Sequence, residues 1–258
     1  MKIGMIQLDG AAGDVERNVN RAFSLLEEAA GRAELLVLPE LWTIGYNFHD
    51  LSAHAVRPGD GLLEKLSSFA RFHQIYLAAG TLPVQKEGRI YNTGFLFGKQ
   101  GEILGTYSKR HLFGGYLEGD LMTPGTDLME AQMGENQCGM GICYELYFPD
   151  MYREMAKRGT TFVFVPASWP LVHISKWEVL ARARAIENGM YICAVNMAGS
   201  YHGVTLGGHS LFINPEGKIL ARCGTSEEIQ YADYDLAAYP DLGKQLAVIR
   251  SVRSPAEG

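Results

Sequence analysis

The sequence predicts an α/β protein with two mixed sheets that are covered by helices on their outer faces. Short runs rich in β-branched and aliphatic residues recur along the chain, and segments with helical spacing separate them. The runs are apolar on both faces instead of alternating, which is typical of strands buried between two layers. Two hairpins are inserted among the helix-linked strands, so the pattern does not predict a simple doubly wound sheet.

Each predicted element has its own signal. The buried strands are KIGMIQL at 2–8, ELLVLPE at 34–40, IYLAAGTL at 75–82, GMGICYE at 139–145, TFVFVPAS at 161–168 and YICAVNMAG at 191–199. Apolar residues at helical spacing predict helices over 14–31, 62–70 and 174–181, and Gly31 is a suitable stop for the first of them. The stretches 91–107 and 208–224 predict hairpins that turn at Gly101 and Gly217.

The chain length bounds the domain organisation. A chain of 258 residues is long enough for one large α/β domain or two small ones, and no linker divides it. We therefore expect a single domain over residues 1–258. Its tail, from about residue 240, is expected to be extended or to lie at an oligomer interface.

Composition and charge argue against several classes of partner. The net charge is −6 and no basic face is evident, which disfavours nucleic acid. No stretch approaches the roughly 18 consecutive apolar residues that a membrane span needs. The first residues, MKIGMIQLDG, turn polar too soon for a signal peptide, and the four cysteines lack the spacing of a zinc site or a disulfide framework. These features favour a cytoplasmic protein with a small-molecule partner and no metal.

Three ionisable or reactive side chains come at the ends of predicted strands. Glu40 ends the apolar run at 34–40, Lys109 follows the first hairpin, and Cys143 lies in the run at 139–145. Active sites of α/β proteins gather at strand ends, where loops present side chains on a rigid base. Taken singly, each residue also has an ordinary interpretation: a capping or surface carboxylate, a solvated lysine and an inert buried thiol.

Together the three side chains supply the chemistry of amide hydrolysis. A thiol becomes a good nucleophile when it loses its proton, and a carboxylate whose pKa is raised by apolar surroundings can take that proton. An ammonium group and a backbone N–H can stabilise the negative charge that develops on the carbonyl oxygen. The protonated carboxyl can then donate its proton to the leaving amine.

The segments around these residues resemble a known family. LPELW around Glu40, YSKRHLF around Lys109 and GICYELYFPD around Cys143 are similar to the three signature regions of the nitrilase, or carbon–nitrogen hydrolase, superfamily, in the same order. PASWP at 166–170, ARARAIEN at 181–188 and GHSLFINPEGKIL at 208–220 extend the resemblance over nearly the whole chain. Within the superfamily the chain looks most like the omega-amidase-like, Nit-type branch.

The resemblance implies an α-β-β-α sandwich and a role for each residue. Glu40 is the implied general base, Lys109 the group that steadies the tetrahedral intermediate and Cys143 the nucleophile. Glu118 is implied to fix the lysine and the substrate, with an ordinary loop carboxylate as the alternative. The backbone N–H of Tyr144 is implied to complete the oxyanion site. The family chemistry needs no metal or organic cofactor, and a homodimer or higher homo-oligomer is expected.

One position departs from the family pattern. Relatives usually carry an arginine four residues after the cysteine, in a CYDxRFPE pattern, whereas this chain has Tyr147 there and Glu145 in place of the aspartate. If that arginine binds a substrate carboxylate in relatives, its replacement makes a neutral amide or a nitrile more plausible as substrate. Arg110 or Arg182 are candidates to compensate, although Arg182 lies four residues after Glu178 and is also placed to pair with it.

The predicted function is that of a cysteine-dependent amidase. Its substrate is a small linear carboxamide, either the omega-amide of a dicarboxylic or 2-oxo acid or a neutral aliphatic amide. Nitrilase and N-carbamoyl amidohydrolase activities are alternatives with the same three residues, and a non-catalytic binding protein of the same family is an alternative of another class. Candidate pocket walls are Tyr46, Phe113, Tyr147 and Trp169, although aromatic residues at strand ends also serve as core or interface residues.

Overall fold

The first sheet of the computed structural model is mixed and has six strands within the described residues, which are 1–57, 59–115, 117–201, 203–239 and 248. Its strands are β1 (Lys2–Gln7), β2 (Leu35–Val37), β3 (Tyr76–Lys86), β4 (Arg89–Phe97), β5 (Ile103–Ser108) and β14 (Glu228–Asp233). Their order is β14-β1-β2-β3-β4-β5. The β1–β2 and β2–β3 pairs are parallel, and the other pairs of this sheet are antiparallel.

The second sheet repeats this combination of parallel and antiparallel pairs. Its strands are β6 (Ala131–Met133), β7 (Asn136–Met140), β8 (Phe162–Ala167), β9 (Tyr191–Asn196), β12 (Leu211–Ile213) and β13 (Ile219–Arg222). In the described part of the chain their order is β13-β12-β9-β8-β7-β6, with parallel pairs at β7–β8 and β8–β9. A separate short ribbon pairs β10 (Ser200–Tyr201) with β11 (Val204–Thr205).

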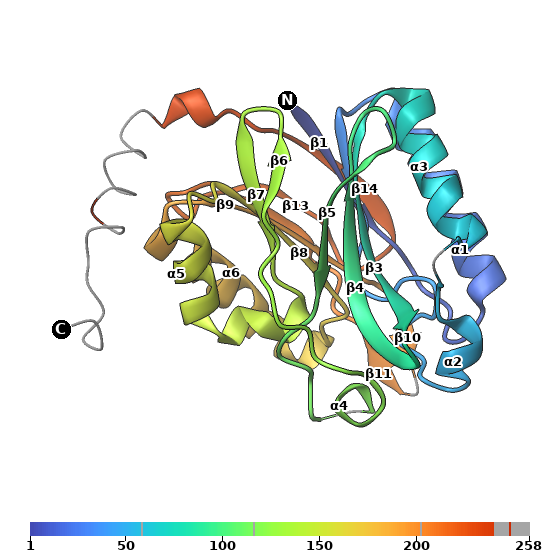
Figure 1. Ribbon diagram of the computed structural model, residues 1–258. Coiled ribbons are helices and arrows are strands. Elements are labelled where there is room, and N and C mark those ends of the chain that lie inside the picture. The colour runs from blue at the N-terminus through green and yellow to red at the C-terminus, as the bar shows by residue number, and fades with distance from the viewer. Residues whose placement is uncertain (58, 116, 202, 240–247, 249–258) are drawn as a thin grey trace.

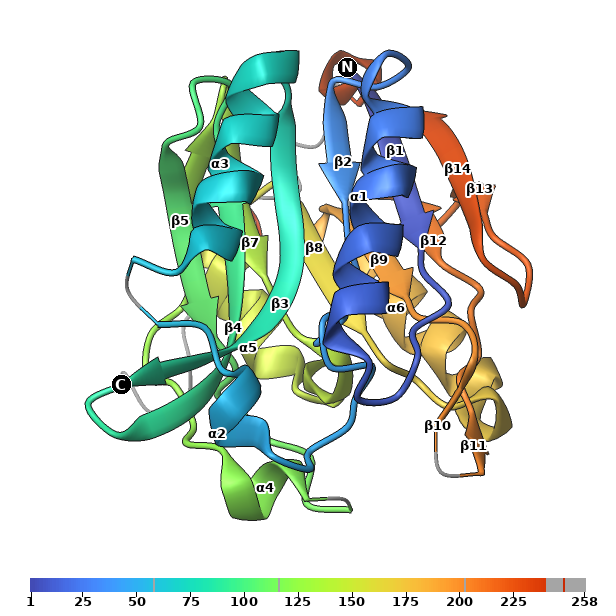
Figure 2. The ribbon, with the colours of Figure 1, turned by 90° about the vertical axis from the view of Figure 1, so that its right-hand side faces the viewer.

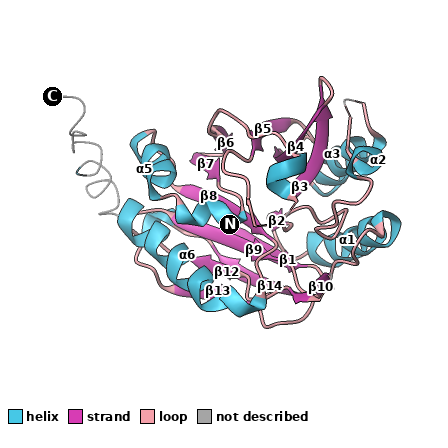
Figure 3. Cartoon of the chain, turned by 90° about the horizontal axis from the view of Figure 1, so that it is seen from below, coloured by secondary structure: helices cyan, strands magenta, loops and turns pink. Residues whose placement is uncertain are grey.

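Helices cover the outer faces of both sheets. The α-helices are α1 (Val15–Ala30), α2 (Leu51–His54), α3 (Gly61–His73), α4 (Glu118–Leu121), α5 (Pro149–Lys157) and α6 (Ile174–Asn188). Figure 2 shows α1 and α3 in front of the first sheet, and Figure 3 shows α5 and α6 outside the second. The predicted arrangement of two mixed sheets flanked by helices is therefore confirmed, and none of the helices in the described residues has the length and apolar character to cross a membrane.

The strand β2 illustrates why the runs are apolar on both faces. Leu35 and Val37 belong to the core between the two sheets, whereas Leu36 belongs to the core between the first sheet and its helices. Successive side chains of a strand point to opposite faces, so a strand with a layer on each side needs apolar residues at every position. The continuous apolar runs thus follow from the layered architecture visible in Figure 1.

Local signals place most of the other elements as expected. Asp14 caps α1 by accepting the Arg17 N–H at 3.1 Å, and the helix ends before Gly31. The two hairpins form β4–β5 and β12–β13, and Gly101 and Gly217 have φ of 82° and 78°, which suits glycine at a tight turn. The predicted tail from about residue 240 falls outside the described residues, apart from residue 248.

Candidate active site

Glu40 follows β2 and its side chain is completely buried. Its Oε1 accepts hydrogen bonds from Asn92 Nδ2 at 2.9 Å and from Lys109 Nζ at 2.8 Å. Its Oε2 accepts the Ser168 backbone N–H at 2.9 Å, and Ser168 Oγ donates to the Glu40 carbonyl oxygen at 3.0 Å. Because Ser168 follows β8 of the second sheet, the carboxylate is fixed where strand ends of the two sheets meet.

Lys109 directly follows β5 and is also completely buried. Besides Glu40, its Nζ donates to Glu118 Oε1 at 2.9 Å and Oε2 at 2.8 Å. Glu118, the first residue of α4, further accepts Asn92 Nδ2 at 2.8 Å and the Phe113 N–H at 2.9 Å. The structure therefore brings Glu40, Lys109 and Glu118 into one buried cluster, and Glu118 contacts the lysine.

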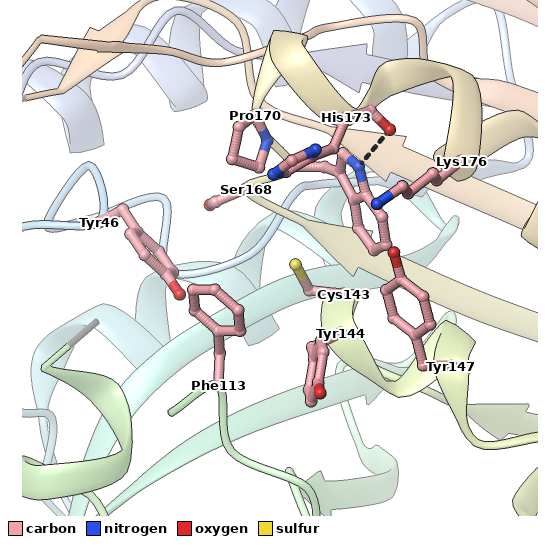
Figure 4. Close-up of a pocket in the computed structure, with 10 residues that line it drawn as sticks. Tyr46, Phe113, Cys143, Tyr144, Tyr147, Ser168, Pro170, His173 and Lys176 are labelled. Carbon is pink, nitrogen blue, oxygen red and sulfur yellow. Dashed lines mark hydrogen bonds between the residues drawn. The ribbon is translucent and has the colours of Figure 1, made fainter. Parts of the chain in front are cut away.

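Cys143 lies in a turn, so the prediction of a strand over 139–145 is wrong beyond residue 140. The strand β7 ends at Met140, and Cys143 begins a 3-10 helix that extends to Tyr147. The φ of Cys143 is 50°, a left-handed conformation that costs free energy in a residue with a Cβ. Figure 4 shows its sulfur pointing into the space between Tyr46, Phe113 and Ser168.

Glu145 explains why the strand stops there. Its completely buried carboxylate accepts the Ile142 N–H at 2.7 Å through Oε2, and its own N–H donates to the Ile142 carbonyl oxygen at 3.0 Å. These local bonds use the N–H and carbonyl groups of Ile142, which a longer strand would pair with a neighbouring strand. The apolar periodicity of the sequence does not distinguish a longer strand from this turn. Oε1 accepts Tyr107 OH at 2.7 Å and the N–H groups of Arg110 and His111 at 2.9 and 3.1 Å. Glu145 thus joins the turn that carries Cys143 to the segment that carries Lys109.

Burial and charge shift the pKa values of three site residues. Burial raises the pKa of the Glu40 carboxyl, although Lys109 and a hydrogen bond from the Cys143 thiol oppose the shift. Burial also raises the pKa of the Cys143 thiol well above its usual value, and the Glu40 charge adds to this. For Lys109, burial lowers the pKa, but the charges of Glu40 and Glu118 outweigh it and the net pKa is raised. The lysine is therefore a permanent cation, and the resting thiol keeps its proton until a base removes it.

A pocket of about 340 Å³ opens above the cysteine. The residues that line it are Tyr46, Phe113, Cys143, Tyr144, Tyr147, Ser168, Trp169, Pro170, His173 and Lys176. All four candidate wall residues from the sequence are among them. Tyr147 stacks on Trp169 with ring centroids 5.7 Å apart, and Phe113 contacts Tyr144 edge to face at 5.3 Å. The walls are mainly aromatic, which suits a small organic ligand.

Neither arginine that the sequence offered as a replacement cation lines this pocket. Arg182 Nε donates to the Gly217 carbonyl oxygen at 2.9 Å, and one of its terminal nitrogens lies 3.8 Å from Glu178, the alternative pairing expected for it. Arg110 lines a different cavity, where its guanidinium lies 4.0 Å from Glu154. The positive charge on the described pocket lining comes instead from Lys176, with His173 beside it.

Sequence reasoning did not single out Asn92, Ser168, Pro170, His173 or Lys176 as site residues. A weak signal existed for Asn92, a polar residue inside the apolar hairpin at 91–107. His173 and Lys176 are three residues apart at the start of a helix, a spacing that places side chains on one face. Ser168 acts largely through its backbone N–H, which sequence patterns do not reveal.

The fold and the site together define a class of protein. Two packed mixed sheets hold a thiol, a buried carboxylate pair and a buried ammonium beside one aromatic pocket. The described residues contain no group of three or more His, Cys, Asp or Glu side chains arranged to hold a metal ion. This combination is that of the thiol hydrolases predicted from the sequence. The chain belongs to the carbon-nitrogen hydrolase family, whose model matches residues 2–242, and it is a hydrolase of carbon–nitrogen bonds.

Similar proteins support this assignment along the full chain. The 2-oxoglutaramate amidase of Bacillus subtilis is 33% identical over 252 residues, covering 97% of each chain. Among solved structures, Saccharomyces cerevisiae Nit3, a member of branch 10 of the nitrilase superfamily, superimposes with a TM-score of 0.87 at 28% identity, covering 100% of this chain and 97% of that one. A mutant amidase from Nesterenkonia sp. AN1 has a TM-score of 0.86 at 27% identity, covering 100% and 94%. That structure carries the acetamide moiety of fluoroacetamide on its active-site cysteine.

Proposed function

We propose that the protein is a cysteine-dependent amidase that converts a small linear carboxamide into a carboxylic acid and ammonia. The observation that carries the proposal is the hydrogen-bonded set of Glu40 and Lys109 beside the Cys143 thiol, at the base of an aromatic pocket. The relatives named amidases add support, among them the 2-oxoglutaramate amidase and the amidase whose cysteine binds an acetamide group.

The proposed reaction begins with proton transfer from Cys143 Sγ to Glu40, whose raised pKa makes it a competent base. The thiolate attacks the amide carbon, and Lys109 with the Tyr144 N–H stabilises the oxyanion that forms. Glu40 returns the proton to the leaving nitrogen as the carbon–nitrogen bond breaks, which releases ammonia and leaves a thioester on Cys143.

In the second half of the reaction a water molecule takes the place of ammonia. Glu40 removes a proton from this water, and the resulting hydroxide attacks the thioester carbon. Collapse of the second tetrahedral adduct breaks the carbon–sulfur bond, releases the carboxylic acid and returns the proton to Cys143. Every proton that Glu40 accepts is thus given back within one turnover.

The test is an ammonia-release screen. It covers omega-amides of dicarboxylic and 2-oxo acids, neutral aliphatic amides, carbamoyl amino acids and nitriles. Equimolar ammonia and carboxylic acid from an amide supports the proposal. Carbon dioxide released together with ammonia would instead identify an N-carbamoyl amidohydrolase, and nitrile consumption without accumulation of free amide would identify a nitrilase.

A mass measurement separates an enzyme from a non-catalytic member of the family. A slowly turned-over amide should add a stoichiometric acyl mass at Cys143, whereas absence of any adduct with amides, nitriles and carbamoyl compounds would favour a binding protein.

We further propose a single domain over 1–258, a reduced cytoplasmic setting, and assembly into a homodimer or higher homo-oligomer. The four buried free cysteines support the cytoplasmic setting. Sedimentation velocity of the purified chain tests the assembly.

A further inference from the structure

Lys176 stands out on the described pocket lining because it is the one side chain there that carries a permanent positive charge. It lies in the first turn of α6, and Figure 4 shows its side chain reaching from the helix toward the pocket. Lys109, the other ammonium of the site, is saturated by three carboxylate contacts beneath the cysteine. Lys176 is therefore the cation left for a substrate group.

The surroundings of Lys176 leave its charge uncompensated. Its amino group forms no hydrogen bond or ion pair with any residue that the structure describes, and no Asp or Glu is among the described lining residues. The nearby Glu178 is engaged by Arg182 and Arg222. A cation in the first turn of a helix also opposes the helix dipole, so helix stability does not account for a lysine at this place.

Tyr147 is a second polar group that lines the pocket near this cation. The family pattern that the sequence resembles implies an arginine at this position, and the Tyr147 hydroxyl lies on the same side of the pocket as the Lys176 amino group (Figure 4). Burial raises the pKa of Tyr147, so the hydroxyl stays protonated and can donate a hydrogen bond. Tyr147 and Lys176 together thus offer a neutral hydrogen-bond donor and a cation at the mouth of the pocket. In the family pattern the guanidinium of one arginine would offer both.

The aromatic walls make this pair selective. Trp169 and Tyr147 stack, and Tyr144 contacts Tyr147 at 5.4 Å, so aromatic rings replace water along this wall of the pocket. Charge–charge attraction is stronger where fewer water molecules screen it. A neutral amide gains only apolar contacts here, whereas an amide with a carboxylate at its far end gains those contacts and an ion pair.

We propose that Lys176 is the specificity-determining residue that binds the distal carboxylate of the substrate, with Tyr147 as a hydrogen-bond donor to the same group. The inference rests on the proposed amidase function and narrows its substrates to amides that carry an acid group at the opposite end. In this assignment the cation that meets the carboxylate comes from α6 and not from the segment that carries Cys143.

The experiment compares two amides of matched size, succinamate and butyramide, which differ by a carboxylate in place of a methyl group. Ammonia release is measured for the unchanged enzyme and for Lys176→Met, Lys176→Arg and the control Lys157→Met, which makes the same change at the end of α5 away from the pocket. We expect Lys176→Met to lower kcat/KM for succinamate about fivefold, mainly through KM, because one exposed ion pair is lost. Butyramide turnover should stay within about twofold, and both Lys176→Arg and Lys157→Met should retain the preference for succinamate.

A rescue variant tests the relation to the family pattern. Tyr147→Arg added to Lys176→Met should restore at least part of the succinamate turnover, because it places a guanidinium four residues after Cys143, as in the family pattern. Equal effects of Lys176→Met on both amides, or none on succinamate, would overturn the inference while the amidase function stands. If the unchanged enzyme released ammonia from no amide at all, the proposed function would be overturned and this inference with it.

Discussion

The Nζ atom of Lys109 lies 2.8 Å from Oε1 of Glu40, and both side chains are completely buried. A buried ion pair is expensive to desolvate and persists where every donor and acceptor is satisfied. Here Asn92 and the Ser168 N–H complete the coordination of Glu40, and Glu118 completes that of Lys109. Both side chains of the pair are therefore held in place by several hydrogen bonds beneath the thiol. The contribution of each charge can be measured by replacing one residue at a time.

Removal of the lysine charge should destabilise the fold. Lys109→Met leaves Glu40 and Glu118 buried against each other, and we expect the free energy of unfolding to fall by about 3–5 kcal/mol in urea titrations. The double variant with Glu118→Gln should lose less than the sum of the two single variants, since one of the uncompensated carboxylates is gone. Simple additivity would contradict the coupling of these two residues.

Cys143 should be indispensable for turnover. Cys143→Ala is expected to reduce ammonia release by about a thousandfold or more while leaving the circular dichroism spectrum unchanged. Cys223→Ala is the matched control, because this thiol is buried at the end of the second hairpin and does not line the pocket. Ammonia release by the Cys143 variant at the normal rate would rule out the proposed nucleophile.

The pH dependence should reflect the raised pKa of Glu40. A protonated Glu40 accepts no proton from the thiol, so activity falls as the pH drops through this pKa, and the acid limb of kcat/KM should have its midpoint above 4.5, the ordinary value for this group. Glu40→Gln should lower kcat by about 10²- to 10⁴-fold and remove this limb. A midpoint at or below the ordinary value would contradict the raised pKa.

The raised pKa of Glu40 also makes the free energy of unfolding depend on pH. Between pH 4.5 and the raised value the native state keeps a proton on Glu40 that the unfolded state has lost. The contribution of this group to the free energy of unfolding therefore declines as the pH rises through that window. Glu40→Gln, which does not titrate, should lack this decline in urea titrations repeated across the same pH range.

Glu145 should act on catalysis by positioning Cys143 relative to Lys109. Glu145→Asp shortens the carboxylate by one methylene, so it no longer reaches both Ile142 and Tyr107. We expect kcat to fall about 10- to 100-fold with KM changed by less than about twofold, because the reacting groups are displaced while the pocket walls are kept. Tyr107→Phe is the control, since it removes one hydrogen bond and leaves the connection through the backbone N–H groups. An equal loss of kcat in the control would assign the effect to the Tyr107 hydrogen bond and not to the backbone connection.

Much of the architecture was predictable from short-range patterns. Runs such as 34–40 and 161–168, whose inner residues are all apolar, predicted strands between two layers, and β2 and β8 occupy those places. Glu40, Lys109 and Cys143 were recognisable because each sits in a short motif next to a strand end. Burial and periodicity are local properties of a chain, so they can be inferred from neighbouring residues.

The contacts that complete the site were decided by the tertiary structure. Ser168 donates to Glu40 from 128 positions away in the sequence. Glu145 accepts a hydrogen bond from the segment that carries Lys109, and no local sequence pattern predicts this contact. The positive φ of Cys143 is imposed by that packing and not by an intrinsic preference of cysteine. The sequence by itself determined the fold class and the reactive groups. Which cation lines the pocket, Lys176 and neither Arg110 nor Arg182, depended on how α6 packs beside the pocket, because the direction of a side chain is set by contacts between distant segments.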